Sequence, residues 1–485
     1  MAVNTDRSLQ QQVIYSVYVR AHTQEGTFRA VIPDLDRIKA LGTDIIWFLP
    51  IHPIGVKNKK GSLGCPYANR DYRTVNPEYG TMEDFKALVD EIHARGMKVM
   101  IDVVYNHTAP DSTLLEQHPE FFYRDAEGKT GNRVGDWSDV IDLDYGVPEL
   151  WDYQINSLCI WAEMVDGFRC DVASLVPLEF WKRARAAVEE VHPGFIWLAE
   201  TVHRSFCVES RARGFAFGHD SEMFDAFDIE YEYDIRETFD AFLQGRTPLS
   251  HYLEDMVFQE AVYPDNYNKL RFLENHDQPR IASYVPDHSD LINYTAMLYF
   301  FKGTTLLYAG QEFEDDHLPS LFEREPIDRT TGFDLSPLMR RLAEIKKRDL
   351  SADDVFFGRA DDDSEIAVLR RSNADAVKYG VFSLGSLKKE VAVDAPDGTY
   401  VNLIDGEPVT VEHGVVKCER KPIIFSVPTH PAPVEDTGED KEDDRFTRLT
   451  KAFQAPWETY VQSVQSGKSV MERFFVNPFE KKNDE

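Results

Sequence analysis

The 485-residue chain lacks several features that mark whole classes of protein. It has no apolar run of about 18 residues, so no membrane-spanning helix is expected. Its opening segment, MAVNTDRSLQQQ, has no basic stretch followed by an apolar one, so a secretory signal peptide is not expected either. Its five cysteines include no CxxC pair and no Cys/His cluster, which argues against a disulfide framework and a structural zinc site. These absences favour a cytoplasmic protein with free thiols.

Positive charge is also scarce. The chain has 53 Lys and Arg residues against 84 Asp and Glu residues, a formal net charge of −31. Such a charge repels nucleic-acid phosphates and anionic lipid surfaces, so neither is an expected partner and a neutral substrate is favoured. With 42% hydrophobic and 12% aromatic residues, the chain can bury a large core. Composition therefore predicts a globular protein, and it leaves the oligomeric state open.

Short apolar segments alternate with helical patterns through most of the chain. One helical pattern, TMEDFKALVDEIHARG, has Thr81 placed to cap its start and Gly96 placed to end it. The expected strands are 13–19, 44–51, 98–104, 164–170, 194–200, 224–230, 268–274 and 304–310. Eight strand–helix units predict a closed (β/α)8 TIM barrel of the α/β class. An open doubly wound sheet is the alternative, but no GxGxxG follows the first strand.

Two regions depart from this alternation. About forty loop-like residues separate the third strand from its helix, and loops of that length are uncommon unless they serve a site. Beyond residue 350, short alternating strands with turn signals predict a small antiparallel β-sandwich. The expected domains are the barrel at 1–104 and 149–350, an inserted loop domain after strand 3 at 105–148, the C-terminal β-sandwich at 351–428, and an acidic linker and tail at 429–485.

Three expected strands lead to a carboxylate. Asp171 ends VDGFRCD, Glu200 ends FIWLAE, and Asp277 ends LRFLENHD. The carboxyl ends of barrel strands surround one pocket, so the three acids are expected to meet there. An acid that follows a strand often caps the next helix, which is the alternative for each of them taken singly.

A pair of carboxyl groups suits the cleavage of an acetal between two sugars, because one protonates the leaving oxygen while the other stabilises the oxocarbenium-like centre. Arg169 lies two residues before Asp171 and points to the same side of a strand, so it should hold that carboxylate ionised. Glu200 follows the apolar residues FIWL, which should desolvate it, raise its pKa and keep it protonated.

Four segments resemble the sequence motifs of the α-amylase family of retaining α-glycosidases, glycoside hydrolase family 13. They are DVVYNH (102–107), GFRCDVA (167–173), WLAET (197–201) and FLENHD (272–277). The segments YANRDY (67–72) and LYAGQEF (307–313) resemble further parts of the same family. The order of the motifs and their strand placement also match, which weakens the helix-cap explanation.

The resemblance implies a role for each matching residue. Asp171 would be the nucleophile, Glu200 the general acid and then base, and Asp277 the carboxylate that binds sugar hydroxyls. Arg169 would orient the nucleophile. The implied sugar-binding residues are Tyr67, His107 and His276, with Asp71 as their support.

The implied activity is retaining hydrolysis of α-1,4-glucosidic bonds in malto-oligosaccharides or starch fragments, through a covalent glucosyl-enzyme. An α-glucanotransferase with the same intermediate is the first alternative. A non-catalytic barrel that binds carbohydrate or serves a transporter is a second, and the presence of all three acids argues against it.

Calcium is the one cofactor that the resemblance raises. Many secreted members have Lys-His three and four positions after the nucleophile, and that histidine supplies a calcium ligand, whereas this chain has Ser174 and Leu175. Asn106 occupies the position of another ligand, and the loop offers four acids: Asp136, Asp139, Asp142 and Asp144. The same acids could form a hydrogen-bonded turn with a solvated face. The expectation is that no cofactor is required, with Ca²⁺ left open.

Several other aromatic and histidine residues are candidates for the cleft. Five aromatic residues could stack on sugar faces, although most of them are expected in the core: Trp47, Phe121, Phe122, Trp137 and Phe206. Trp47 lies within a strand and is expected in the core, whereas Trp137 lies in the long loop and suits either place equally. His203 lacks metal-ligand spacing and is expected at the surface or in a hydrogen bond.

Overall fold

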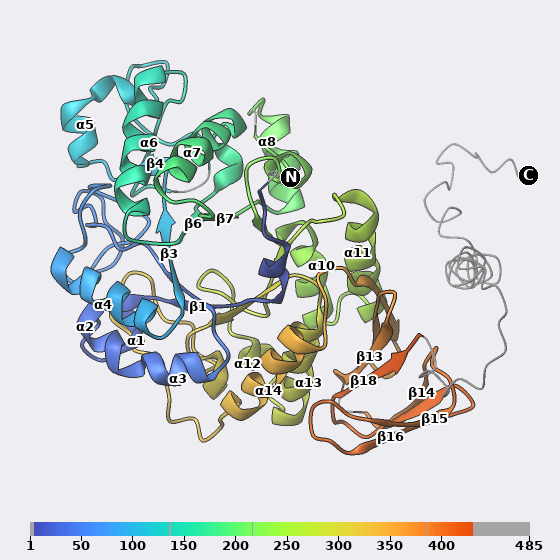
Figure 1. Ribbon diagram of the computed structural model, residues 1–485. Helices are drawn as coiled ribbons and strands as arrows, with labels where there is room; N and C mark the ends of the chain where they lie inside the picture. The colour runs from blue at the N-terminus through green and yellow to red at the C-terminus, as the bar shows by residue number, and fades with distance from the viewer. Residues whose placement is uncertain (1–3, 135–136, 216, 386, 430–485) are drawn as a thin grey trace, which may run out of the picture. The chain divides into compact units, whose positions relative to one another are not determined.

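Eight parallel strands close into a barrel, as the sequence predicts. The computed structural model describes residues 4–134, 137–215, 217–385 and 387–429, and Figure 1 shows the strands surrounded by helices. Around the barrel the order is β1, β2, β3, β6, β7, β8, β9 and β10, with β10 pairing back to β1. The strands are β1 (Val13–Val17), β2 (Ile45–Phe48), β3 (Lys98–Val103), β6 (Gly167–Cys170), β7 (Ile196–Ala199), β8 (Ile229–Tyr231), β9 (Lys269–Arg271) and β10 (Thr304–Tyr308).

The largest difference from the predicted strands is the start of β8. Residues 224–230 were expected to be extended, but β8 starts at Ile229, and the short helix α9 (Asp220–Met223) precedes it with a turn between them. The apolar side chains of Phe224 and Phe227 are fully buried in this turn. Burial of these rings, and not a strand, explains the apolar pattern there.

Helices cover the outside of the barrel. Helix α4 (Met82–Ala94) shows how local sequence sets their limits: Thr81 Oγ1 accepts from the Asp84 amide (3.2 Å), and Asp84 Oδ2 accepts from the Thr81 amide (3.0 Å). Gly96 follows the helix with φ +67°, a conformation that favours glycine. The other helices of this layer are α1 (Val19–His22), α2 (Phe28–Val31), α3 (Leu35–Ala40), α6 (Pro148–Ala162), α7 (Leu178–Val191), α8 (Arg204–Ala212), α10 (Tyr233–Leu243), α11 (Leu249–Val262), α12 (Ile281–Tyr284), α13 (His288–Phe300) and α14 (Ser336–Arg348).

The insert after β3 contains a small antiparallel sheet. Strands β4 (His107–Thr108) and β5 (Ile141–Asp142) pair directly, and the helix α5 (Thr113–Gln117) lies between them in sequence. The Leu143 amide donates to the Asn106 carbonyl at 3.0 Å. This bond joins the end of the insert to the residues that follow β3, and His107 of the insert lines the pocket at the mouth of the barrel.

Two four-stranded antiparallel sheets follow the barrel, as the sequence predicts. One has the order β11-β12-β13-β18 and the other β14-β17-β16-β15. Side chains from both sheets, including Val381 and Val411, share one apolar core. The strands are β11 (Val355–Asp361), β12 (Ile366–Ser372), β13 (Ala376–Ser383), β14 (Lys389–Ala392), β15 (Gly398–Val401), β16 (Pro408–Glu412), β17 (Val415–Cys418) and β18 (Ile423–Pro428).

This sandwich packs on the barrel through aromatic rings. The ring centroids of Phe300 and Phe382 lie 5.8 Å apart, and those of Phe301 and Phe356 lie 6.0 Å apart. The expected acidic linker and tail lies, except for its first residue, outside the described residues. No helix within the described ranges is long and apolar enough to cross a membrane.

Candidate active site

The carboxyl ends of several barrel strands supply one pocket of about 330 Å³. Asp171 directly follows β6, Glu200 directly follows β7, and Asp277 lies in the segment after β9. All three line this pocket, together with residues of the insert such as His107 and Trp137. The structure thus brings together the three acids that the sequence singles out.

Arg169 lies beneath the pocket and is completely buried. Its Nη1 group donates to Asp171 Oδ1 at 2.9 Å and to Asp102 Oδ1 at 2.9 Å, and its Nη2 atom lies 3.0 Å from Glu200 Oε1. Its Nε group donates to the Tyr231 hydroxyl at 3.3 Å. The predicted contact between Arg169 and Asp171 is present, and the same guanidinium also holds Glu200 and Asp102.

The two reacting acids share a strongly perturbed environment. Burial raises the pKa of Asp171 to about 7, because desolvation outweighs the opposing effect of Arg169. Burial likewise raises the pKa of Glu200 to about 7. The expected rise in the pKa of Glu200 is confirmed. Arg169 was expected to hold Asp171 ionised, and it does lower the pKa of that carboxyl, but burial outweighs it. One guanidinium faces three buried carboxyls, so these acids titrate together and retain a shared proton near neutral pH.

Asp277 has a different environment. Burial raises its pKa, but the neighbouring His276 and Arg169 outweigh that effect, so the pKa lies below its usual value. The His276 Nε2 atom lies 2.9 Å from Asp277 Oδ2. The Asp277 side chain is 40% exposed, against 9% for Asp171 and 10% for Glu200. Asp277 therefore presents an ionised carboxylate to whatever enters the pocket.

Tyr67 forms part of the pocket wall above His276. The two rings stack with centroids 5.4 Å apart, and the Tyr67 hydroxyl lies 2.7 Å from His276 Nε2. The same hydroxyl donates to Asp102 Oδ2 at 2.9 Å. Because His276 is almost completely buried, it acts on the pocket through Tyr67 and Asp277 in this structure.

His107 borders the nucleophile candidate. Its Nε2 atom lies 3.9 Å from Asp171 Oδ2, and the Asn106 amide group donates to its Nδ1 atom at 3.2 Å. Burial lowers the pKa of His107 to about 4, so the ring is neutral at neutral pH. With Nδ1 accepting, the proton resides on Nε2, which can donate to a ligand hydroxyl.

The prediction for Asp71 needs correction. It was expected to support the sugar-binding rings, but it does not line the pocket, and its Oδ1 atom accepts from the Arg73 amide at 2.7 Å. Asp102 supports Tyr67 instead. Asp71 is two residues from Arg73, so this hydrogen bond stabilises a local turn. The sequence alone does not distinguish an aspartate that stabilises a turn from one that supports a binding site.

Sequence reasoning missed several pocket residues. His203 was expected at the surface or in a hydrogen bond, but it lines the pocket and its ring stacks on Tyr233 with centroids 4.1 Å apart. Lys60 and Phe322 also line the pocket and come from loops with no strand pattern. Of the residues that were missed, only Asp102 could have been found from the sequence. A charged residue in the middle of a buried strand needs a partner of opposite charge, which indicates a buried ion pair.

Two of the five aromatic candidates line the pocket, and Trp47, Phe121 and Phe122 are buried. Trp137 and Phe206 are the two that line it, so both remain candidates for contact with a sugar ring. Trp47 is fully buried below it, with the Arg169 guanidinium carbon 5.3 Å from its ring centroid.

Two of the four candidate acids of the insert already have cationic partners. Asp139 pairs with the Lys60 ammonium at 3.0 Å, and Asp142 Oδ2 accepts from the Arg133 amide at 2.8 Å and from its Nε group at 3.1 Å. Asn106 uses its amide group on His107. Within the described ranges no three His, Cys, Asp or Glu residues are grouped so as to hold a metal ion, and Asp136 lies outside those ranges. Side-chain cations therefore already balance the charges of Asp139 and Asp142, which disfavours a calcium site built on these two carboxylates.

We expect EDTA to leave the stability of the protein almost unchanged. Since Lys60 and Arg133 already neutralise Asp139 and Asp142, removal of calcium should shift the thermal midpoint by less than about 3 °C. Melting followed by circular dichroism, with and without EDTA and with added CaCl2, measures this. A midpoint more than about 10 °C lower in EDTA would show that the insert holds an ion.

Carboxylates follow neighbouring barrel strands, and one buried arginine contacts them. This arrangement is typical of barrel enzymes that use a pair of carboxyl groups for catalysis. Comparison with known proteins narrows this class. Residues 6–125 and 133–351 match the family model described as "Alpha amylase, catalytic domain", and residues 358–425 match "Bacterial Alpha amylase C-terminal domain". The chain belongs to the α-amylase family of glycoside hydrolases.

Solved structures and curated relatives agree. The crystal structure of an α-amylase from Lactobacillus plantarum is 44% identical, with a TM-score of 0.83 over 87% of this chain and 100% of that chain. A "noncanonic maltogenic alpha-amylase", AmyB of Thermotoga neapolitana, is 32% identical, with a TM-score of 0.77 and the same coverage. The α-amylase MalA of Haloarcula japonica is 26% identical over 82% of this chain, and the match covers 59% of that relative's length.

Proposed function

We propose that this protein hydrolyses α-1,4-glucosidic bonds in malto-oligosaccharides or starch fragments, with retention of configuration. The observation that carries this proposal is the closeness of Asp171 and Glu200. The two terminal nitrogens of one guanidinium contact both carboxyls, and the Val172 amide donates to Glu200 Oε2 at 2.7 Å. A retaining pair needs a separation of about 5 to 5.5 Å, whereas an inverting pair stands further apart to admit a water.

The chemistry proceeds in two displacements. The Asp171 carboxylate attacks the anomeric carbon and forms a glycosyl ester, while Glu200 gives its proton to the departing glycosidic oxygen. Glu200 is then ionised and takes a proton from a water molecule, which attacks the same carbon and releases Asp171. The shared proton between these acids matches this division of work, since one member must be ionised and the other protonated.

The remaining pocket residues bind and orient the sugar. Asp277, ionised and partly exposed, accepts hydrogen bonds from sugar hydroxyls, and His107 donates to them. The Tyr67 ring forms a flat apolar surface on which a pyranose can stack. Arg169 keeps both reacting carboxyls in place and does not reach the sugar, because it is buried beneath them.

The family and its relatives support an α-glucan substrate. The Lactobacillus plantarum protein is an α-amylase, and the Thermotoga neapolitana protein is a maltogenic one. The negative charge of the chain favours a neutral substrate such as a glucan. Arg133 and Lys60 hold the insert acids that would bind Ca²⁺, so we propose that the activity needs no metal.

Maltotriose separates hydrolysis from glucosyl transfer. We expect glucose and maltose as the only products, because attack by water ends each cycle. Chromatography of a time course at high substrate concentration measures them. Accumulation of maltotetraose or longer oligomers ahead of glucose would favour a glucanotransferase that uses the same intermediate, and no cleavage at all would contradict the proposed function.

A further inference from the structure

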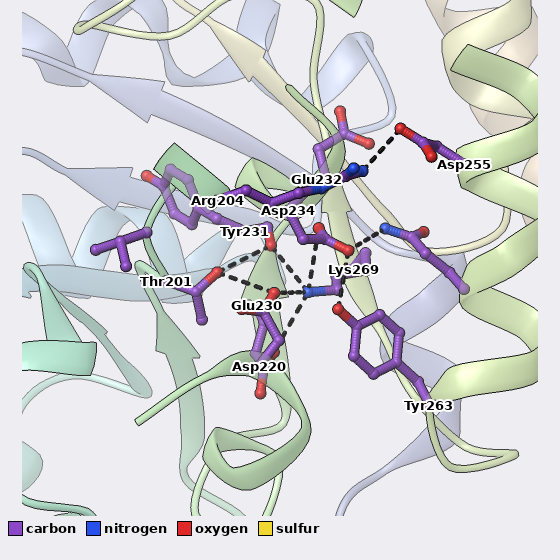
Figure 2. Close-up of polar contacts among 12 residues, drawn as sticks. Thr201, Arg204, Asp220, Glu230, Tyr231, Glu232, Asp234, Asp255, Tyr263 and Lys269 are labelled. Carbon is purple, nitrogen blue, oxygen red and sulfur yellow. Dashed lines mark hydrogen bonds and ion pairs between the residues drawn. The ribbon is translucent and has the colours of Figure 1, made fainter. Parts of the chain in front are cut away.

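A buried cluster of charges lies next to the active site, on β8, β9 and the neighbouring helices. Figure 2 shows its centre, the Lys269 ammonium, surrounded by the carboxyls of Asp220, Glu230 and Asp234. Lys269 pairs with Asp220, lies 3.4 Å from Glu230 Oε2 and 3.5 Å from Asp234 Oδ1, and donates to the Tyr231 carbonyl at 3.2 Å. The side chains of Lys269 and Glu230 are completely buried.

This cluster has too few positive charges for its acids. One ammonium faces three carboxyls, and burial raises the pKa of Asp220 and of Glu230, the latter strongly. Apolar residues at these positions would fill the space at no electrostatic penalty. The position of this cluster beside a reactive pocket points to a role in fixing geometry, and its contacts indicate which part of the site it fixes.

The first connection runs through Thr201, which directly follows Glu200. The buried Thr201 hydroxyl lies 3.3 Å from Asp220 Oδ2 and 3.2 Å from the Tyr231 carbonyl oxygen, so it joins the cluster at two points (Figure 2). The Thr201–Asp220 contact also links the two ends of the segment that contains pocket residues His203 and Phe206.

The second connection runs through Tyr231. Its carbonyl accepts from Lys269, and its hydroxyl accepts from Arg169 Nε at 3.3 Å. Arg169 in turn holds Asp171 and Glu200. Lys269 is thus connected to Glu200 by two routes. One runs through Asp220 to Thr201, the residue after Glu200, and the other runs through Tyr231 to Arg169, which contacts the Glu200 carboxyl.

We propose that Thr201 is a positioning residue: its hydroxyl fastens the backbone after Glu200 to the buried Asp220–Lys269 pair and so aims the Glu200 carboxyl at the leaving oxygen. This inference rests on the proposed function, because it requires Glu200 to be the general acid. Without the hydroxyl, proton delivery to the leaving group suffers, whereas attack by Asp171 does not.

The test compares two substrates that differ in their need for an acid. Cleavage of maltotetraose requires protonation of a sugar alkoxide, whereas α-maltosyl fluoride releases fluoride without acid assistance. We expect Thr201→Val to lower kcat/KM on maltotetraose about tenfold and on α-maltosyl fluoride less than twofold. Thr201→Ser keeps the hydroxyl and should remain within twofold of the parent on both substrates. Thr43→Val, which removes a buried hydroxyl from the segment before β2, is the matched control and should change neither.

Each other outcome overturns the inference. An equal loss of kcat/KM on both substrates for Thr201→Val would indicate a general structural effect, and failure of Thr201→Ser to retain activity would exclude the hydroxyl as the cause. Glu200→Gln tests the proposed function separately. If Glu200 is the general acid, this variant should lose kcat/KM on maltotetraose but should still form the intermediate from α-maltosyl fluoride. If Glu200→Gln cleaves both as the parent does, both proposals fail.

Discussion

Asp171→Asn and Glu200→Gln should each lower kcat on maltotetraose by about a thousandfold or more. The first removes the nucleophile, so no covalent intermediate forms, and the second removes the proton donor to the leaving oxygen. Both changes conserve shape, and each replaces a carboxyl that lies against Arg169. Steady-state rates from released reducing sugar measure the loss.

Stability provides the control for this prediction. Burial raises the pKa of both carboxyls to about 7, whereas such groups titrate near 4 in an unfolded chain. Their ionisation therefore destabilises the fold increasingly between about pH 4 and pH 7, and the neutral variants escape this effect. The thermal midpoint of each variant should equal or exceed that of the parent at pH 8. A variant that keeps more than a few per cent of activity would refute its assigned role.

Arg169→Met should destabilise the protein by about 3 to 5 kcal/mol at pH 8, because it leaves buried carboxylates without their counter-ion. The guanidinium is fully buried and contacts three acids, Asp102, Asp171 and Glu200. Denaturant unfolding at two pH values measures the free energy of unfolding.

The pH dependence of this loss has a definite sign. Without Arg169 the pKa values of the three acids rise further above those of the unfolded chain, so ionisation costs the folded state more as pH rises. At pH 5 the acids are largely protonated in the folded variant, and the loss should be smaller than at pH 8. Arg348→Met, at an exposed arginine paired with Asp349, should have little effect at either pH. A loss for Arg169→Met that is equal at both pH values would contradict the charge argument.

The sequence predicted the barrel well because its strands are short apolar runs, and burial on both faces of a parallel barrel requires such runs. It also predicted that Asp171 and Glu200 would meet, since strand ends converge at one rim. The misplaced start of β8 shows the limit of this reasoning: Phe224 and Phe227 are as buried as strand residues but pack in a turn.

Contacts between strands were less predictable. Arg169 contacts Asp102 because β3 and β6 pair with these two residues opposite each other. The register between two strands cannot be predicted from the sequence of either strand alone. The family resemblance implied Asp71 as support for the sugar-binding residues, but in the fold Asp102, from strand β3, contacts Tyr67. The cluster around Lys269 likewise joins residues from four elements, none of which shows a motif by itself.

The stereochemistry of the first product tests the central claim most directly. Two displacements at one carbon, by Asp171 and then by water, return the original configuration, whereas a single displacement by water inverts it. Proton NMR of maltotetraose during the first minutes of cleavage distinguishes the anomers before mutarotation mixes them. The account predicts that the α-anomer of the released sugar appears first, and initial release of the β-anomer would contradict it.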